Sequence, residues 1–124
     1  MASSPVRAAV LIGLLPAFVW WNVPLRANPG GGVVVHGNVA MEGQGGRVLN
    51  IRQGSTNAII DWESFSIDAD EMTRFIQPGA NSAVLNRVTG GNLSEIQGAL
   101  RANGNVFLIN PNGILVGPGG SIDV

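Results

Sequence analysis

The chain has 124 residues, enough for one domain or less, and 45% of them are hydrophobic while only 12% are charged. The formal net charge is −1 and all seven basic residues are arginines, so no basic surplus supports nucleic-acid binding. There is no cysteine for disulfides, thiolate metal sites or nucleophilic catalysis, and short apolar runs between Gly, Pro and Asn indicate an all-β fold.

Residues 1–27 have the pattern of a secretory signal peptide. Arg7 supplies the positive charge, residues 8–21 form the apolar stretch, and Ala27 places a small residue at the cleavage point before Asn28. As a helix the apolar stretch would span only ~20 Å, which is short of the ~30 Å bilayer core. The alternative is an uncleaved anchor. We expect export, with residues 28–124 forming the mature domain.

From residue 28 onward, short β-type runs alternate with turn signals, a pattern typical of a sheet-rich fold with many corners. The expected strands are residues 33–36, 47–53, 58–62, 65–67, 75–76, 83–88, 106–109 and 114–116, with a further run beginning at residues 121–123.

Residues 92–100 are the one stretch with a helical pattern. Asn92 can cap a helix, and Leu93, Ile96 and Leu100 would share one of its faces. Gly98 weakens this pattern, so we expect no more than about two turns.

The tetrapeptide Asn110-Pro111-Asn112-Gly113 predicts a tight corner. The Asn110 side chain can bond to backbone two residues on, Pro111 pre-sets φ for a type I bend, and Gly113 supplies backbone freedom. The flanking runs, residues 106–109 and 114–116, are apolar without a break, so we expect both of their faces to be buried. Continuously apolar strands joined by such bends are typical of β-solenoid coils.

The mature segment is long enough for about four solenoid coils of ~20–25 residues each, which exceeds the roughly three repeats that a stable stack needs. The run at residues 121–123 begins a new strand just before the last residue. We therefore interpret the sequence as the front end of a longer protein, or as a truncated one.

Five segments, in this order and at these spacings, resemble the N-terminal secretion domain of filamentous haemagglutinin-type exoproteins, which belong to two-partner (type Vb) secretion systems. Within this family the segments are most similar to the high-molecular-weight adhesin branch. The resemblance covers nearly the whole mature chain. The segments are residues 55–67, 75–78, 81–90, 94–98 and 104–114. Residues 77–81 depart from an earlier Asn-Pro-Asn-Leu motif that some members carry at this place.

The resemblance implies a right-handed parallel β-helix (a pectin-lyase-like β-solenoid) with an N-terminal cap. It also implies recognition in the periplasm by the POTRA domains of an outer-membrane β-barrel transporter. The family's secretion motif falls on Asn110, Pro111, Asn112, Gly113 and Ile114. Its Asn-Arg-Val segment, a candidate for transporter recognition, falls on Asn86, Arg87 and Val88.

Two groups of carboxylates invite a chemical interpretation. Asp61 and Glu63 flank Trp62, and paired carboxylates beside an aromatic ring are typical of glycosidases. Any strand gives this spacing, however, and Trp62 is better interpreted as core. Residues 68–71 lack the ligand pattern of a calcium loop. We expect no enzyme, no cofactor and no metal site.

Arg87 is the remaining open question, because a charge within an apolar strand is either ion-paired or part of a recognition surface. We predict a secretion-recognition domain of a protein that is secreted or held at the surface of a Gram-negative-type bacterium. A passenger beyond this segment would bind any host surface or glycan. The alternative is a stand-alone secreted adhesin or glycan-binding module, with a polysaccharide-cleaving enzyme third.

Overall fold

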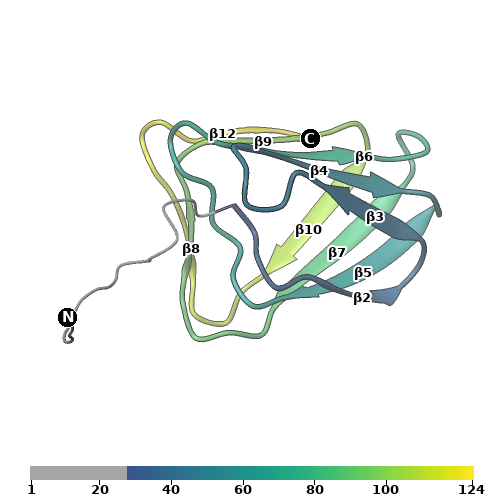
Figure 1. Cartoon of the computed structure of the whole chain (residues 1–124), viewed down its shortest axis with the longest axis horizontal. Coiled ribbons are helices and arrows are strands. Elements are labelled where there is room, and N and C mark those ends of the chain that lie inside the picture. The colour runs from purple at the N-terminus through teal and green to yellow at the C-terminus, as the bar shows by residue number, and fades with distance from the viewer. Residues whose placement is uncertain (1–27) are drawn as a thin grey trace, which may run out of the picture.

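The computed structural model describes residues 28–124, and the predicted signal peptide lies outside the described residues. Every regular element in this part is a β-strand (Figure 1), and none of the described residues belongs to a helix that could cross a membrane. The strands are β2 (Val33–His36), β3 (Val39–Glu42), β4 (Val48–Gln53), β5 (Asn57–Trp62), β6 (Met72–Ile76), β7 (Ala83–Val88), β8 (Ser94–Ile96), β9 (Ala99–Ala102), β10 (Asn105–Ile109), β11 (Ile114–Val116) and β12 (Ser121–Asp123).

The chain coils as a parallel β-helix, as predicted. The strands β4, β6, β9 and β12 stack in parallel, and β5, β7 and β10 form a second parallel stack (Figure 1). Strand β8 pairs in parallel with β11. Residues that pair between successive coils, Val48, Met72, Ala99 and Ser121, are 24, 27 and 22 positions apart (72 − 48, 99 − 72, 121 − 99). There are about three coils rather than the expected four, because residues 28–47 do not form a coil of the parallel stack.

Those residues form a cap over the first coil. Strand β2 lies antiparallel on β5, and β3 lies antiparallel on β4. The Asn28 amide fastens the start of the cap, since Nδ2 donates to the Gly46 and Arg47 carbonyls at 2.9 and 3.1 Å and Oδ1 accepts from the Thr73 hydroxyl at 3.0 Å. The sequence did not predict β3, because its four residues contain a single β-branched side chain and find their partner only in the fold.

Inward-facing side chains of successive coils fill the centre of the β-helix. Strands β4, β5 and β7 alternate between buried and more exposed positions, as strands with one covered face do. Trp62 lies in this core with 1% of its surface exposed, as predicted, and packs edge-on against Phe65 with ring centroids 5.7 Å apart. The buried apolar core consists of Leu49, Ile51, Ala58, Ile60, Trp62, Phe65, Ile67, Phe75, Val84, Val88, Ile96 and Leu100.

The predicted helix over residues 92–100 is wrong. This stretch forms β8 and β9, with a corner at Gly98, whose N–H donates to the Ile67 carbonyl. A Cβ at Gly98 would lie 2.1 Å from the Asp68 carbonyl oxygen, so the glycine is required by close approach of the neighbouring coil. A two-turn helix is marginal by itself, and pairing with coils on both sides outweighs its local pattern.

Two strand predictions also need correction. Residues 65–67 form no strand and contribute a single parallel bridge between Ile67 and Ile96. Strands β10 and β11 are not buried on both faces, since Phe107 is 57% exposed and all of β11 is exposed. Within residues 28–124 each of these two strands pairs on one side only, so their side chains lack a second covering coil.

Candidate functional site

The motif corner, residues 110–114, forms the predicted turn between β10 and β11. The Gly113 N–H donates to the Asn110 carbonyl at 3.0 Å, and the Asn112 N–H donates to the Asn110 side-chain oxygen at 2.9 Å. Gly113 has a φ of +109°, a conformation that a side chain would strain. The local roles predicted for Asn110 and Gly113 are confirmed.

The two asparagine side chains of the motif corner also donate hydrogen bonds to the preceding coil. Asn110 Nδ2 donates to the Asn92 carbonyl at 3.0 Å and to the hydroxyl of the buried Ser94 at 2.9 Å. Asn112 Nδ2 donates to the Gly90 carbonyl at 2.8 Å. The motif therefore holds two successive corners in register and presents a fixed backbone shape at the surface; it offers no nucleophile, acid or base.

The Asn86, Arg87 and Val88 segment lies mostly inside the β-helix. Asn86 is fully buried, accepting from Trp62 Nε1 at 2.8 Å and donating to the Phe107 carbonyl at 3.2 Å, and Val88 is 5% exposed. The side chain of Arg87 points outward. Its Nε lies 2.7 Å from Asp61 Oδ1, with the two side chains 42% and 28% exposed, so the ion-pair interpretation of Arg87 is confirmed.

Replacing Arg87 with glutamine is expected to lower the free energy of unfolding by no more than about 1 kcal/mol, because the ion pair is partly solvated. Urea denaturation of Arg87→Gln, Asp61→Asn and the double variant would measure the coupling between the two side chains. A coupling of several kcal/mol between the two side chains would contradict the expectation. The variant Asn86→Leu, which changes a fully buried side chain, is compared with Arg87→Gln, which changes a partly exposed one.

A ladder of buried amides, which the sequence analysis missed, joins the corners between the two large sheets. Gln77 Nε2 donates to Gln53 Oε1 at 3.2 Å, and Gln77 Oε1 accepts from the Gly104 N–H at 2.8 Å. The Gln77 backbone exchanges two hydrogen bonds with the Asn103 side chain, at 2.7 and 2.8 Å. The detectable signal was an amide side chain at or directly after the end of β4, β6 and β9 (Gln53, Gln77 and Asn103), at the spacing of one coil.

Three of the carboxylates considered above, those of Asp61, Asp70 and Glu71, make structural contacts. Asp61 pairs with Arg87, Asp70 lies 3.6 Å from Arg47, and the Glu71 side chain accepts from the Asp68 N–H at 3.0 Å. Across residues 28–124, no group of three His, Asp or Glu side chains is arranged to hold a metal ion.

These features define the class of fold, a capped parallel β-helix that is locked by side-chain amides. The chain belongs to the TPS secretion domain family, whose sequence model matches residues 26–124, and it is an N-terminal secretion domain of a two-partner exoprotein. The family is a secretion domain of adhesin-like exoproteins.

The chain is similar to two proteins of Haemophilus influenzae that are named heme/hemopexin-binding protein. It is 46% identical to one over 90 residues, which covers 73% of this chain and 10% of that protein. It is 46% identical to the other, from strain Rd, over 99 residues, which covers 80% of this chain and 11% of that protein. The chain thus spans about a tenth of the length of these relatives.

The fold is also that of a solved structure, the crystal structure of the HMW1 secretion domain from Haemophilus influenzae. The TM-score is 0.68 and the sequence identity is 48%, over 73% of this chain and 24% of that chain. The resemblance to the high-molecular-weight adhesin branch and the predicted β-helix are confirmed by these matches.

Proposed function

We propose that this domain delivers its exoprotein to an outer-membrane β-barrel transporter, whose POTRA domains recognise it in the periplasm. The observation that carries the proposal is the match of the TPS secretion domain family along residues 26–124, which includes the whole described β-helix. In this proposal residues 1–27 act as the signal peptide, and the mature protein is secreted or displayed at the cell surface.

The exposed strand edges suit such a delivery role. Strand β2 lies at the edge of its sheet and exposes Val33, Val34 and Val35, so it can accept an added strand from a partner. At the opposite end, the exposed apolar side chains of β10 and β11 can be covered by coils that stack on them. Downhill stacking outside the cell would draw the rest of the chain outward without ATP.

Within this proposal the motif corner contributes through the backbone shape that its amides fix. Asn86 and Val88 contribute through the core, because both are buried. Arg87 is the member of that segment whose side chain a transporter can contact.

The test is export of the full chain in a Gram-negative host. The host is used with and without the POTRA-containing transporter that is encoded in the chain's genome of origin. We expect the chain in the medium only when the transporter is present, and in the periplasm when a transporter without its POTRA domains replaces it. Equal amounts in the medium without any transporter would overturn the proposal. Mass analysis of the periplasmic form would show whether residues 1–27 have been removed.

Any binding of a host surface or glycan is assigned in this proposal to the passenger of the exoprotein. The names of the Haemophilus relatives refer to heme and hemopexin, and this chain spans about a tenth of those proteins. Retention of the isolated chain on a glycan column would instead favour the stand-alone adhesin.

A further inference from the structure

Two asparagine residues of the chain are directly followed by glycine. The pairs are Asn103-Gly104 and Asn112-Gly113, and the second lies within the motif corner. A glycine in this place has no Cβ, so its backbone nitrogen can approach the side-chain amide carbon of the asparagine without steric hindrance. In an unfolded chain both pairs can therefore undergo a spontaneous reaction between backbone and side chain.

The reaction is deamidation. The backbone nitrogen of the glycine loses its proton and bonds to Cγ of the asparagine, the Cγ–Nδ2 bond breaks, and ammonia leaves. Water then opens the resulting cyclic imide to aspartate, or to isoaspartate, in which the main chain runs through the side-chain carboxyl carbon. One water molecule is consumed and one ammonia is released, so the reaction needs no side-chain nucleophile, oxidant or cofactor.

The fold engages both reacting groups of the pair Asn112-Gly113. The Gly113 N–H, whose nitrogen would attack, donates to the Asn110 carbonyl at 3.0 Å. Asn112 Nδ2, which would leave, donates to the Gly90 carbonyl at 2.8 Å and to Asn110 Oδ1 at 3.1 Å. The attack therefore requires the corner to open. Because both side-chain bonds are exposed, a local opening of the corner is sufficient.

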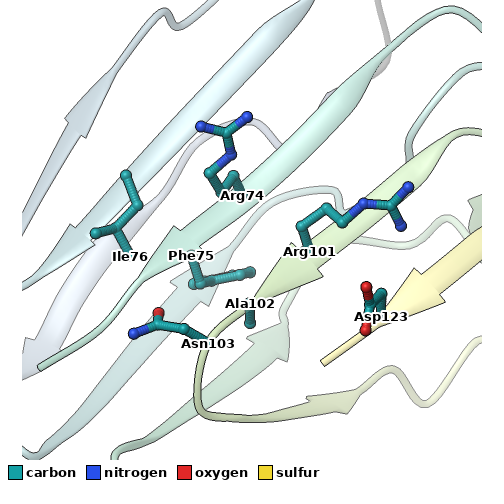
Figure 2. Close-up of a pocket in the computed structure, with 7 residues that line it drawn as sticks. All are labelled: Arg74, Phe75, Ile76, Arg101, Ala102, Asn103 and Asp123. Carbon is teal, nitrogen blue, oxygen red and sulfur yellow. The ribbon is translucent and has the colours of Figure 1, made fainter. Parts of the chain in front are cut away.

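The pair Asn103-Gly104 is held more firmly. Asn103 follows Ala102, the last residue of β9 (Figure 2), and its side chain exchanges two hydrogen bonds with the Gln77 backbone, at 2.7 and 2.8 Å. Gly104 is buried, and its N–H donates to Gln77 Oε1 at 2.8 Å. Freeing this nitrogen would break the buried amide ladder between successive coils, which is a larger opening than the one at Asn112.

We propose that Asn112 is a site of spontaneous deamidation, which reacts when the motif corner opens and reacts before Asn103 does. The rate at each asparagine is then the rate in the unfolded chain multiplied by the fraction of molecules in which that pair is open. The dipeptide is the same at both places, so the order of reaction follows from the hydrogen bonds of the fold.

The product changes the motif corner itself. An aspartate at position 112 has no amide hydrogen, so it cannot donate to the Gly90 carbonyl or to Asn110 Oδ1. Its carboxylate would instead face these two acceptor oxygens, which repel it. Deamidation thus removes a bond to the preceding coil, and a chain that has reacted while unfolded closes its corner less stably.

The test is peptide mass analysis of the full chain, recovered from the periplasm and incubated in mildly alkaline buffer with and without guanidinium chloride. In the unfolded chain Asn112 and Asn103 are expected to react at similar rates. In the folded chain Asn112 should react about tenfold or more slowly than when unfolded, and Asn103 more slowly still. The proposal is overturned if denaturant does not accelerate the reaction at Asn112, or if Asn103 reacts first in the folded chain.

A variant separates local opening of the corner from unfolding of the whole domain. Asn110→Ala removes the oxygen that accepts from the Asn112 N–H and Nδ2, so folded Asn112 should react several-fold faster. Asn81→Ala is the matched control, because Asn81 is exposed and the described structure shows no hydrogen bond of its side chain. Faster reaction at Asn112 alone supports protection by the corner. An unchanged rate at Asn112, or equal acceleration at Asn103, contradicts it.

The effect of the product is measured with Asn112→Asp, compared with Asn81→Asp, which adds the same charge away from the corner. Tm is expected to fall for the first variant, because a carboxylate replaces a hydrogen-bond donor, and to stay near the wild-type value for the second. A Tm of Asn112→Asp equal to that of the wild type would show that deamidation leaves the corner intact.

Discussion

Replacing Trp62 with alanine is expected to lower the free energy of unfolding by about 3–5 kcal/mol, the usual cost of removing a large buried aromatic side chain. Trp62 is 1% exposed, packs against Phe65, and donates from Nε1 to the buried Asn86 side chain. The change leaves both a cavity and an unpaired acceptor in the core. Urea denaturation followed by circular dichroism would measure the loss.

Two further variants divide this effect into its parts. Trp62→Phe keeps an aromatic ring but removes the donor, so we expect a smaller loss that includes about 1–3 kcal/mol for the unpaired Asn86 oxygen. Phe107→Ala is the control, because this aromatic side chain is 57% exposed and should matter much less. An unchanged urea midpoint for Trp62→Ala would show that Trp62 does not hold the first two coils together.

The double variant Asn110→Ala/Asn112→Ala is expected to reduce export by about tenfold or more. Each lost hydrogen bond costs about 1 kcal/mol, and without these bonds the corner loses its shape. The double variant removes the bonds to Asn92, Ser94 and Gly90, together with the side-chain acceptor for the Asn112 N–H. The measurement is the ratio of chain in the medium to chain in the periplasm, in cells that express the transporter.

The matched control for this double change is Asn81→Ala/Asn92→Ala, which removes two exposed asparagine side chains for which the described structure shows no hydrogen bond. Thermal unfolding of the same variants separates two mechanisms. Loss of export together with a lowered Tm indicates that the corner acts through its shape. Loss of export at an unchanged Tm indicates that the transporter contacts the amides directly, and full export of the double variant would refute the motif's role.

Features that depend on neighbouring residues could be predicted from the sequence. The turn at Asn110 and Gly113 follows from the hydrogen-bonding reach of asparagine and the backbone freedom of glycine, and both were found as predicted. Most strands were also predicted, because apolar runs bounded by Gly, Pro and Asn need only a covered face to become strands. The resemblance to secretion domains joined these local elements into a β-helix.

Features that depend on stacking could not be predicted. Ile96 and Leu100 follow a helical spacing, yet they point into the core from two different strands on either side of the corner at Gly98. Asn86 lies in an apolar strand and gave no sign that its amide would be enclosed, because its partners Trp62 and Phe107 belong to the coils before and after it. Pairing between residues more than 20 positions apart decides these placements.

The amide ladder has a consequence for how an exported chain could assemble. Gln77 bonds to Gln53 in the preceding coil and to Gly104 in the following one, and Asn86 links its own neighbouring coils in the same way. A coil that slipped by one residue would turn these amides away from their partners and strand polar groups in an apolar interior. We therefore expect a newly added coil to stack stably only when its residues are in the correct register with those of the preceding coil.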